Sequence, residues 1–309
     1  MTKTLTASEA RALPAGIGPL AMLCGGICIG FAPIGLRFGL ADMGPQAVAF
    51  WRYSFALPLL FLICVLFQRR LPAVPNRYVI IAGVCFALDI GLWHWGLSLT
   101  TVANATFIVN LGNIGVGLTA WIFLKETPTR IWALAVVIAL SGAAALSLGG
   151  GTSGQGHVRG DILSLGAAIM VSLYIVASKL ARRTLSAIDT IFWLTFVEIL
   201  VAAIWVILLK ERFMPDQLSA FYAPLFLALI VQILGQGLIV FGLGHTPTAM
   251  AGVLILVQPV VAAAISWRLF DEPLAPLQAG GAVLILIGIV ISQGGRGQAK
   301  PISAGKSVR

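Results

Sequence analysis

The chain has 309 residues and a mean hydropathy of +0.99, and 59% of its residues are hydrophobic while only 10% are charged. Because soluble domains carry about 25% charged residues, this composition excludes an ordinary water-soluble protein and predicts a chain that lies in a lipid bilayer. The formal net charge of +9 is typical of basic loops that flank membrane spans, so we expect no nucleic-acid partner.

Ten apolar runs are each long enough to cross a bilayer as a helix, which needs about 20 mostly apolar residues. The runs are continuous, whereas the strands of a transmembrane β-barrel alternate apolar and polar residues in segments of about ten, so a barrel is excluded. We therefore predict an all-α integral membrane protein with ten transmembrane helices. The predicted spans are 18–39, 46–67, 77–99, 101–123, 130–149, 158–179, 187–209, 221–243, 247–269 and 275–293.

Two halves of the chain resemble each other residue by residue, which indicates one five-span unit that is duplicated. Halves of this kind usually enclose a site between them in membrane transporters. The matching pairs are Trp95-Gly96-Leu97 with Phe241-Gly242-Leu243, Thr100 with Thr246 and Glu126 with Glu272 at a shift of 146 residues, and Phe50-Trp51 with Phe192-Trp193 and Arg37 with Lys179 at a shift of 142 residues.

The distribution of basic residues predicts the orientation in the membrane. Of the 20 Lys and Arg residues, 14 fall on one side of the predicted spans, 5 fall on the other, and Arg52 lies within a span. The positive-inside bias then places both termini in the cytoplasm. We expect the protein in the cytoplasmic (inner) membrane. Because each half has five spans, the second half is expected to be inverted relative to the first. The predicted parts are a cytoplasmic tail at 1–17, a five-helix repeat at 18–149, a linker at 150–157, a second repeat at 158–293 and a basic cytoplasmic tail at 294–309.

The first two spans carry a proline and a charge. Pro33 frees a backbone carbonyl within the first span, as does Pro259, which we expect to kink the ninth span. Arg52 lies about six residues into the second span. Its side chain either extends to the lipid headgroups or pairs with another helix, or it faces a cavity.

Two carboxylates lie within predicted spans. Asp89 and Trp93 are four residues apart in the third span and share one helix face, and His94 lies about one turn further out. Glu198 lies near the middle of the seventh span. A carboxylate buried in an apolar medium can bind and release a proton near neutral pH, so Asp89 is a candidate for proton coupling, with Glu198 and His94 as alternates. The alternative is that these carboxyls are structural groups held by neighbouring hydroxyls or amides.

The fourth, eighth and ninth spans carry amides at similar depth. Asn110 and Asn113, with Asn104 nearby, can point into one cavity, although the same amides could instead hold helices together. Gln232 and Gln236 share a face of the eighth span, and Gln258 precedes Pro259 in the ninth. This convergence predicts a polar site between the halves.

The remaining features predict structure instead of chemistry. Glu126 and Glu272 each precede a new helix, where a carboxylate stabilises the positive end of the helix dipole, so both are expected to cap the helix that follows. The fifth and tenth spans are apolar and rich in small residues, which is typical of a scaffold or of a homodimer contact. The four Cys and three His residues lack the spacing of a metal site, and we expect no cofactor.

The order of these motifs resembles the drug/metabolite transporter superfamily, in particular its EamA-type members. The resemblance rests on Gly96-Leu97-Ser98-Leu99-Thr100-Thr101-Val102-Ala103-Asn104-Ala105 at the entry to the fourth span, on Leu124-Lys125-Glu126 at its end, and on Phe50-Trp51-Arg52. It covers nearly the whole chain, and it departs from the family pattern at Asn113, where a proline is usual. The resemblance implies a carrier of small metabolites such as amino acids or drugs, with a cavity formed mainly by spans 1, 3, 4, 6, 8 and 9.

The function expected from the sequence is a secondary transporter that exports a small metabolite by alternating access, with Asp89 as the candidate for coupling to protons. An uncoupled facilitator or channel of the same fold is the alternative. We do not expect an enzyme, because the His residues are far apart in sequence and no phosphate-binding loop is present. The expected substrate contacts are Asp89, Trp93, Asn110, Asn113, Tyr174, Gln232, Gln236 and Gln258, with Trp95 as a further aromatic wall.

Overall fold

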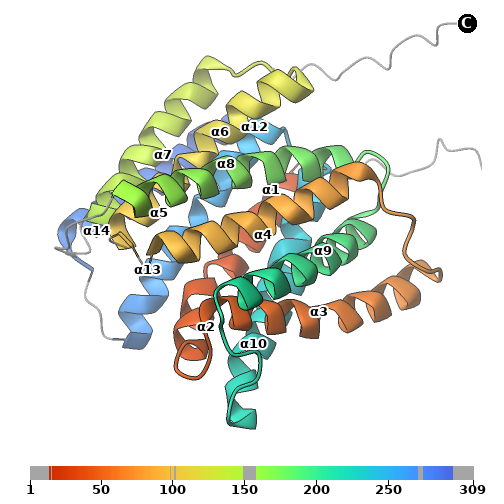
Figure 1. The fold of residues 1–309 in the computed structure, drawn as a ribbon. Coiled ribbons are helices and arrows are strands. Elements are labelled where there is room, and N and C mark those ends of the chain that lie inside the picture. Colours follow the sequence, from red (N-terminus) through yellow and green to blue (C-terminus); the bar gives the residue numbers. More distant parts are fainter. Residues whose placement is uncertain are drawn as a thin grey trace, which may run out of the picture.

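The computed structural model describes residues 14, 16–97, 99–100, 102–148, 158–270 and 274–294, without the side chains of residues 97, 102–104, 114 and 294. Both predicted tails lie almost wholly outside the described residues, and the linker at 150–157 and the predicted cap Glu272 lie outside them as well. Within the described residues the secondary structure is entirely helical (Figure 1).

Ten helical segments are long and apolar enough to cross a membrane, which confirms the predicted all-α fold with ten spans. We call the end of the bundle at which α1 begins the N side (right in Figure 1) and the opposite end the far side. In chain order the spans are formed by α1 (Ile17–Ile29) with α2 (Ala32–Gly39); α3 (Pro45–Gln68); α4 (Arg77–Leu97); α5 (Val102–Asn110) with α6 (Gly112–Thr119) and η1 (Ala120–Leu124); α7 (Arg130–Leu148); α8 (Val158–Ala181); α9 (Ala187–Leu208); η2 (Leu218–Phe221) with α10 (Tyr222–Phe226), η3 (Leu227–Gln236) and α11 (Gly237–Leu243); α12 (Thr248–Ile255) with α13 (Val257–Phe270); and α14 (Pro276–Gly294).

Two of the spans are interrupted close to their prolines. The first span breaks between α1 and α2, where Pro33 lies in the first turn of α2. The ninth breaks between α12 and α13, just before Pro259. A proline has no N–H to donate to the carbonyl four residues earlier, so the helix can change direction there at little cost. The predicted kink of the ninth span is confirmed.

The fifth and tenth spans pack directly against each other. A Cβ atom built on Gly142 would lie 2.5 Å from the carbonyl oxygen of Gly281, and one built on Gly281 would lie 2.6 Å from that of Gly142. Gly288 approaches Ala139 and the Ala135 carbonyl in the same way. Small residues allow this close approach of two backbones, so α7 and α14 form an internal scaffold.

Helices α3 and α9 lie side by side in opposite directions and make equivalent contacts at their two ends. On the far side, Trp51 near the start of α3 donates from Nε1 to the carbonyl of Phe213, in the loop after α9, at 2.5 Å. On the N side, Trp193 near the start of α9 donates from Nε1 to the carbonyl of Ala73, in the loop after α3, at 2.7 Å. Trp51 and Trp193 are equivalent in the sequence repeat, so this reciprocity supports the inverted repeat, which as a whole stays a prediction.

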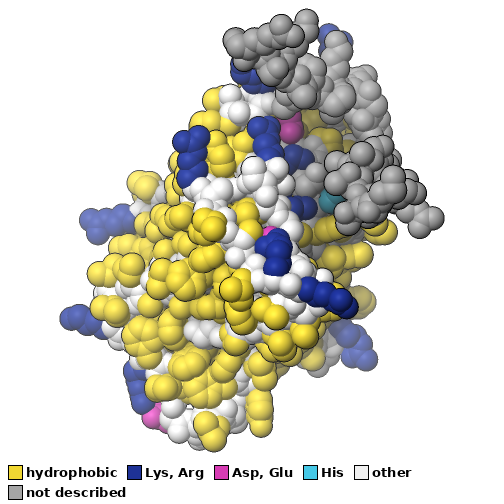
Figure 2. All heavy atoms as spheres, turned by 90° about the vertical axis from the view of Figure 1, so that its right-hand side faces the viewer, with side chains coloured by type: hydrophobic (Ala, Val, Ile, Leu, Met, Phe, Trp, Pro, Cys, Tyr) yellow, Lys and Arg dark blue, Asp and Glu magenta, His cyan; other side chains and the backbone are white. Residues whose placement is uncertain are grey.

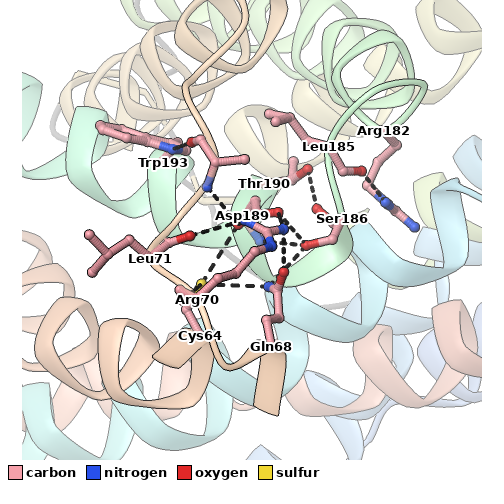
Figure 3. A network of polar contacts seen from close by, with 11 residues as sticks. Cys64, Gln68, Arg70, Leu71, Arg182, Leu185, Ser186, Asp189, Thr190 and Trp193 are labelled. Atoms are coloured by element: carbon pink, nitrogen blue, oxygen red, sulfur yellow. Dashed lines mark hydrogen bonds and ion pairs between the residues drawn. The ribbon is translucent and has the colours of Figure 1, made fainter. Parts of the chain in front are cut away.

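A network of hydrogen bonds connects the start of α9, at the N side, to the loop after α3 (Figure 3). The carboxylate of Asp189 accepts from Arg70 Nη2 at 2.6 Å, from Ser186 Oγ at 2.7 Å and from the Ala73 backbone N–H at 3.0 Å. Ser186 also accepts from the Asp189 backbone N–H at 3.1 Å and so caps α9. Every oxygen of this buried carboxylate has donors, and we interpret the network as structural.

At the far side, a carboxylate caps α3 in a similar way. Glu211 Oε2 accepts from the backbone N–H groups of Gln46 and Ala47, both at 2.9 Å. Burial raises the pKa of the Glu211 carboxyl, and the two N–H donors oppose this shift. The cap joins the first turn of α3 to the loop that leads from α9 into the eighth span.

Glu126 caps a helix, but it is not the helix that the sequence predicts. Its Oε2 accepts from the Thr248 backbone N–H at 2.7 Å and its Oε1 accepts from Thr248 Oγ1 at 3.1 Å. The capped helix is therefore α12 of the second half, whereas the prediction placed the cap on α7, which follows Glu126 in sequence. The carboxylate still stabilises the positive end of a helix dipole, but tertiary packing determines which helix Glu126 caps.

The N side is closed by further contacts between spans. Lys179, near the end of α8, donates from Nζ to the carbonyl oxygens of Leu243 at 2.6 Å and Thr246 at 2.7 Å, beyond the end of α11. Trp132 in α7 donates from Nε1 to the carbonyl of Ala249 in α12 at 2.9 Å. A cation at the carbonyl end of a helix is favourable, so these bonds hold the N-side ends of α7, α8, α11 and α12 together.

Basic residues gather at the N side among the described residues. Figure 2 views this side and shows several Lys and Arg side chains above the apolar surface, with few Asp or Glu side chains. The N-side helix ends and loops carry Arg69, Arg70, Arg77, Lys125, Arg130, Lys179, Arg182 and Arg183, and those of the far side carry Arg37, Arg159, Lys210, Arg212 and Arg268.

Candidate functional site

A buried polar cluster lies where α3, α9 and η3 meet. Arg52 donates from Nε and Nη2 to Gln232 Oε1 at 3.1 and 2.7 Å. Gln232 in turn donates from Nε2 to Glu198 Oε2 at 2.6 Å and to Thr195 Oγ1 at 2.8 Å. Arg52 is 7% exposed, and Gln232 and Glu198 are 0% exposed. A single amide therefore links a guanidinium of the first half to a carboxyl of the second.

This geometry rules out one of the roles considered for Arg52, the extension to the lipid headgroups, whereas Arg52 both pairs with another helix and lines a hollow. Its side chain does not extend to the membrane surface, because it is buried and is held by two hydrogen bonds within the bundle. The arginine also faces the ring of the adjacent Tyr53, with 5.2 Å between Cζ and the ring centroid. The cluster therefore keeps a full positive charge inside the apolar part of the molecule, where charged groups are costly and usually functional.

The two glutamines of the eighth span reach different neighbours. Both lie in η3, a segment with π-helical hydrogen bonding, and segments of this kind are frequent at functional sites. Gln232 contacts Arg52 and Glu198, whereas Gln236 donates from Nε2 to Tyr174 Oη of α8 at 2.7 Å. The eighth span thereby joins the cluster to the sixth span.

Asp89 of α4 lies on the other side of the same region. It is 6% exposed, and no hydrogen bond to it is seen among the described residues. Asp89 and Glu198 both lie within electrostatic range of Tyr53 and Tyr174. One turn before Asp89, the ring of Phe86 packs on that of Tyr174 with 4.9 Å between centroids. Two carboxyls, two tyrosines and one arginine therefore share one buried region.

Several polar atoms of this region are buried without a hydrogen-bond partner among the described residues. They include the hydroxyl of Tyr53, Oε1 of Glu198, and the indole N–H groups of Trp93 and Trp205. Buried polar groups are normally paired, and leaving one unpaired costs about 1–3 kcal/mol. Each of these unpaired groups could form a hydrogen bond with a ligand or a water.

A small hollow of about 40 Å³ adjoins Arg52. Arg52, Trp93 and His94 line it together with apolar residues such as Pro33, Ile90 and Leu227. His94 is held from the other side by Gln46, with 3.4 Å between Gln46 Nε2 and His94 Nδ1. A larger cavity of about 480 Å³ lies apart from the cluster, between α2, α10 and α13, and its lining is mostly aromatic and aliphatic.

The amides of the fourth and ninth spans do not join the cluster in this conformation. Asn113 donates from Nδ2 to the carbonyl of Asn110 at 2.9 Å, within its own span. Gln258 lies against α1, where its carbonyl oxygen is 3.1 Å from a Cβ built on Gly30. Among the described residues, no hydrogen bond connects any of these three amides to Arg52, Gln232 or Glu198. Their predicted substrate contacts stay predictions.

Sequence reasoning did not anticipate three members of the site. Gln46 contacts His94 and Thr195 contacts Gln232 through hydrogen bonds between different spans, and the ring of Tyr53 lies beside Arg52 of the same helix. Gln46 and Thr195 stand next to apolar residues and have no motif around them. A signal was available only for Tyr53, which directly follows the arginine within the span.

The comparisons with known proteins agree with this architecture. The sequence profile of the EamA-like transporter family matches residues 16–148 and, a second time, residues 158–293. The chain belongs to the EamA-like transporter family. It is therefore a transporter and a multi-pass membrane protein, as the resemblance in the motifs implied.

Two curated relatives of this EamA-like transporter are themselves named as uncharacterized transporters. The transporter YwfM of Bacillus subtilis (strain 168) is 27% identical over 216 residues, which are 69% of this chain and 72% of the relative. A transporter of Archaeoglobus fulgidus is 26% identical over 270 residues, which are 83% of this chain and 79% of the relative. A crystal structure with 17% identity covers 90% of this chain and 97% of its own, with a TM-score of 0.74, and supports the fold.

Proposed function

We propose that this EamA-like transporter moves a small metabolite across the cell membrane by alternating access and couples the movement to protons. The observation that carries the proposal is the buried cluster of Arg52, Gln232, Glu198 and the nearby Asp89, which is assembled from both halves. A proton and a solute can compete or cooperate only where titratable groups lie beside the site, and this cluster meets that condition.

Glu198 is the strongest candidate for the proton-binding residue. Its Oε2 is occupied by the amide of Gln232, whereas its Oε1 has no partner among the described residues and is free to take a proton. Asp89 is the second candidate, since it is less enclosed and lies close to Tyr53 and Tyr174. His94 is the third, through its place beside Arg52 at the hollow.

Alternating access requires one side of the carrier to be closed while the other opens. The bonds from Lys179 to Leu243 and Thr246, and from Glu126 to Thr248, favour a conformation that is closed at the N side. The excess of basic residues at this side supports its assignment to the cytoplasm. Export is the proposed direction, and an amino acid or a drug-like amphipathic compound is the proposed class of substrate.

The first test is uptake of a pooled metabolite and amino-acid mixture into proteoliposomes, with and without an imposed pH gradient. Concentrative uptake of a compound only in the presence of the gradient is the expected result. Equilibration that does not depend on the gradient would support the alternative, an uncoupled facilitator in which the carboxyls are structural. If no compound enters faster than in protein-free liposomes, the proposal fails for the classes in the pool.

A further inference from the structure

We propose that the hollow beside Arg52 is an anion subsite that binds a carboxylate group of the transported solute. The inference deepens the proposed function and rests on it. The subsite lies between α2, α3, α4 and η3, and Arg52, Trp93 and His94 line it.

The groups available at this hollow are hydrogen-bond donors. Arg52 uses Nε and Nη2 to hold Gln232 and keeps Nη1 for another acceptor. The indole N–H of Trp93 is buried and has no acceptor among the described residues. In the arrangement in which Gln46 donates to His94 Nδ1, the imidazole proton lies on Nε2, so His94 is also a donor. A hollow lined by three residues that carry hydrogen-bond donors is suited to an anion.

The charge of Arg52 points to the same ligand. Among the described residues, its guanidinium forms no ion pair, since Glu198 is reached only through the Gln232 amide. A buried charge is normally stabilised by a counter-charge in direct contact, and a single neutral amide compensates it only in part. The hollow is the place where a counter-charge can approach, because Arg52 is itself part of its lining.

The dimensions suit a small anionic group. A volume of about 40 Å³ exceeds the roughly 10–15 Å³ that a single water needs, so the hollow has room for a small group such as a carboxylate. Gln232 is the positioning residue of the subsite. Its two hydrogen bonds fix the plane of the Arg52 guanidinium. Another edge of the guanidinium stays available, and bidentate binding of a carboxylate requires such an edge.

The surrounding titratable groups couple this subsite to protons. Arg52 of α3 and His94 of α4 line the hollow, and Glu198 of α9 lies one amide away from Arg52, through Gln232. Asp89, Tyr53 and Tyr174 belong to the same buried region. An anion bound at Arg52 is repelled by the ionised carboxyls of Glu198 and Asp89. Binding of the anion and binding of a proton are therefore expected to favour each other, so acetate binding should strengthen as the pH falls.

The test measures binding of acetate to the purified full-length transporter in detergent, with acetamide as the neutral isostere, by thermal stability at constant ionic strength. Acetate should stabilise the protein in a saturable manner, more strongly at mildly acidic than at mildly alkaline pH, and acetamide should not. Trp93→Phe, which removes one donor and keeps an aromatic ring, should weaken acetate binding about tenfold. Trp267→Phe, at an exposed tryptophan, is the matched control and should leave acetate binding unchanged.

Arg52→Lys provides a second variant that keeps the positive charge but cannot hold Gln232 through two nitrogens. It should abolish the difference between acetate and acetamide or reduce it severalfold. Equal effects of acetate and acetamide on the native protein would overturn the inference, as would unchanged acetate binding in Trp93→Phe. Because binding is measured without transport, these results are distinguishable from a failure of uptake, which would instead overturn the proposed transport function.

Discussion

At the scale of single residues, Gln232 is the centre of the candidate site. Its oxygen accepts two bonds from Arg52, and its nitrogen donates to Glu198 and Thr195. All of the strong hydrogen-bonding capacity of the amide is used, so Gln232 is better suited to hold other residues in place than to bind a solute directly. Gln236, one helical turn later, makes a single bond to Tyr174.

Replacement of Gln232 by Leu should therefore destabilise the protein far more than replacement of Gln236 by Leu. The first change leaves a buried guanidinium and a buried carboxyl without their shared partner and should lower the free energy of unfolding by roughly 2–4 kcal/mol, against about 1 kcal/mol for the second. Denaturant unfolding in mixed micelles measures both values. Similar losses in the two variants would contradict the central place of Gln232.

At the scale of helices, the adjacent glycines Gly280 and Gly281 of α14 differ in how closely they approach the backbone of α7. A Cβ on Gly281 would lie 2.6 Å from the Gly142 carbonyl oxygen and 2.6 Å from the Leu146 nitrogen, both of which are backbone atoms. A Cβ on Gly280 would meet nothing within 4 Å. Replacement by Ala at Gly281 therefore tests the packing of α14 against α7, whereas the same replacement at Gly280 tests helix propensity alone.

Gly281→Ala is expected to lower the melting temperature, because α14 must move away from α7 to admit the methyl group. Gly280→Ala is expected to keep the melting temperature or raise it slightly, since Ala favours a helix by about 1 kcal/mol relative to Gly. Thermal unfolding of both variants in the same detergent decides the matter. A greater loss at Gly280 would show that α7 and α14 do not pack as described.

At the scale of the whole molecule, equivalent basic residues of the two halves have different partners. Lys179 binds the carbonyls of Leu243 and Thr246 at the N side. Its counterpart Arg37 packs over the ring of Phe270 at the far side, with 4.0 Å between Cζ and the ring centroid. Opening of the N side would require the two bonds from Lys179 to break.

Lys179→Met should shift the protein toward an open N side. The neighbouring Ser178 is 0% exposed and serves as the reporter when it is changed to Cys in a background without the four native cysteines. Maleimide labelling of Ser178→Cys should become severalfold faster in the Lys179→Met variant. Arg183→Met, which removes a neighbouring exposed charge, is the control and should leave the rate unchanged. Equal rates in all three proteins would contradict the role of Lys179.

The sequence predicts the spans well and the site only in part, for a physical reason. A bilayer forces each span to satisfy its own backbone hydrogen bonds, so length and apolar composition reveal the ten helices, and Pro259 reveals a kink. The partner of Glu126 is set by tertiary packing between the halves, and the sequence pointed to the wrong helix. The π-helical register of η3, which separates the partners of Gln232 and Gln236, likewise has no local sign.

The central claim is that the buried carboxyl of Glu198 couples protons to transport. The most direct measurement compares the native protein with Glu198→Gln in proteoliposomes, using the compound identified by pooled uptake, with Glu211→Gln as a control outside the spans. The account predicts that Glu198→Gln still exchanges substrate across the membrane at equilibrium but no longer accumulates it when a pH gradient is imposed. Accumulation by Glu198→Gln at the native level would contradict the account.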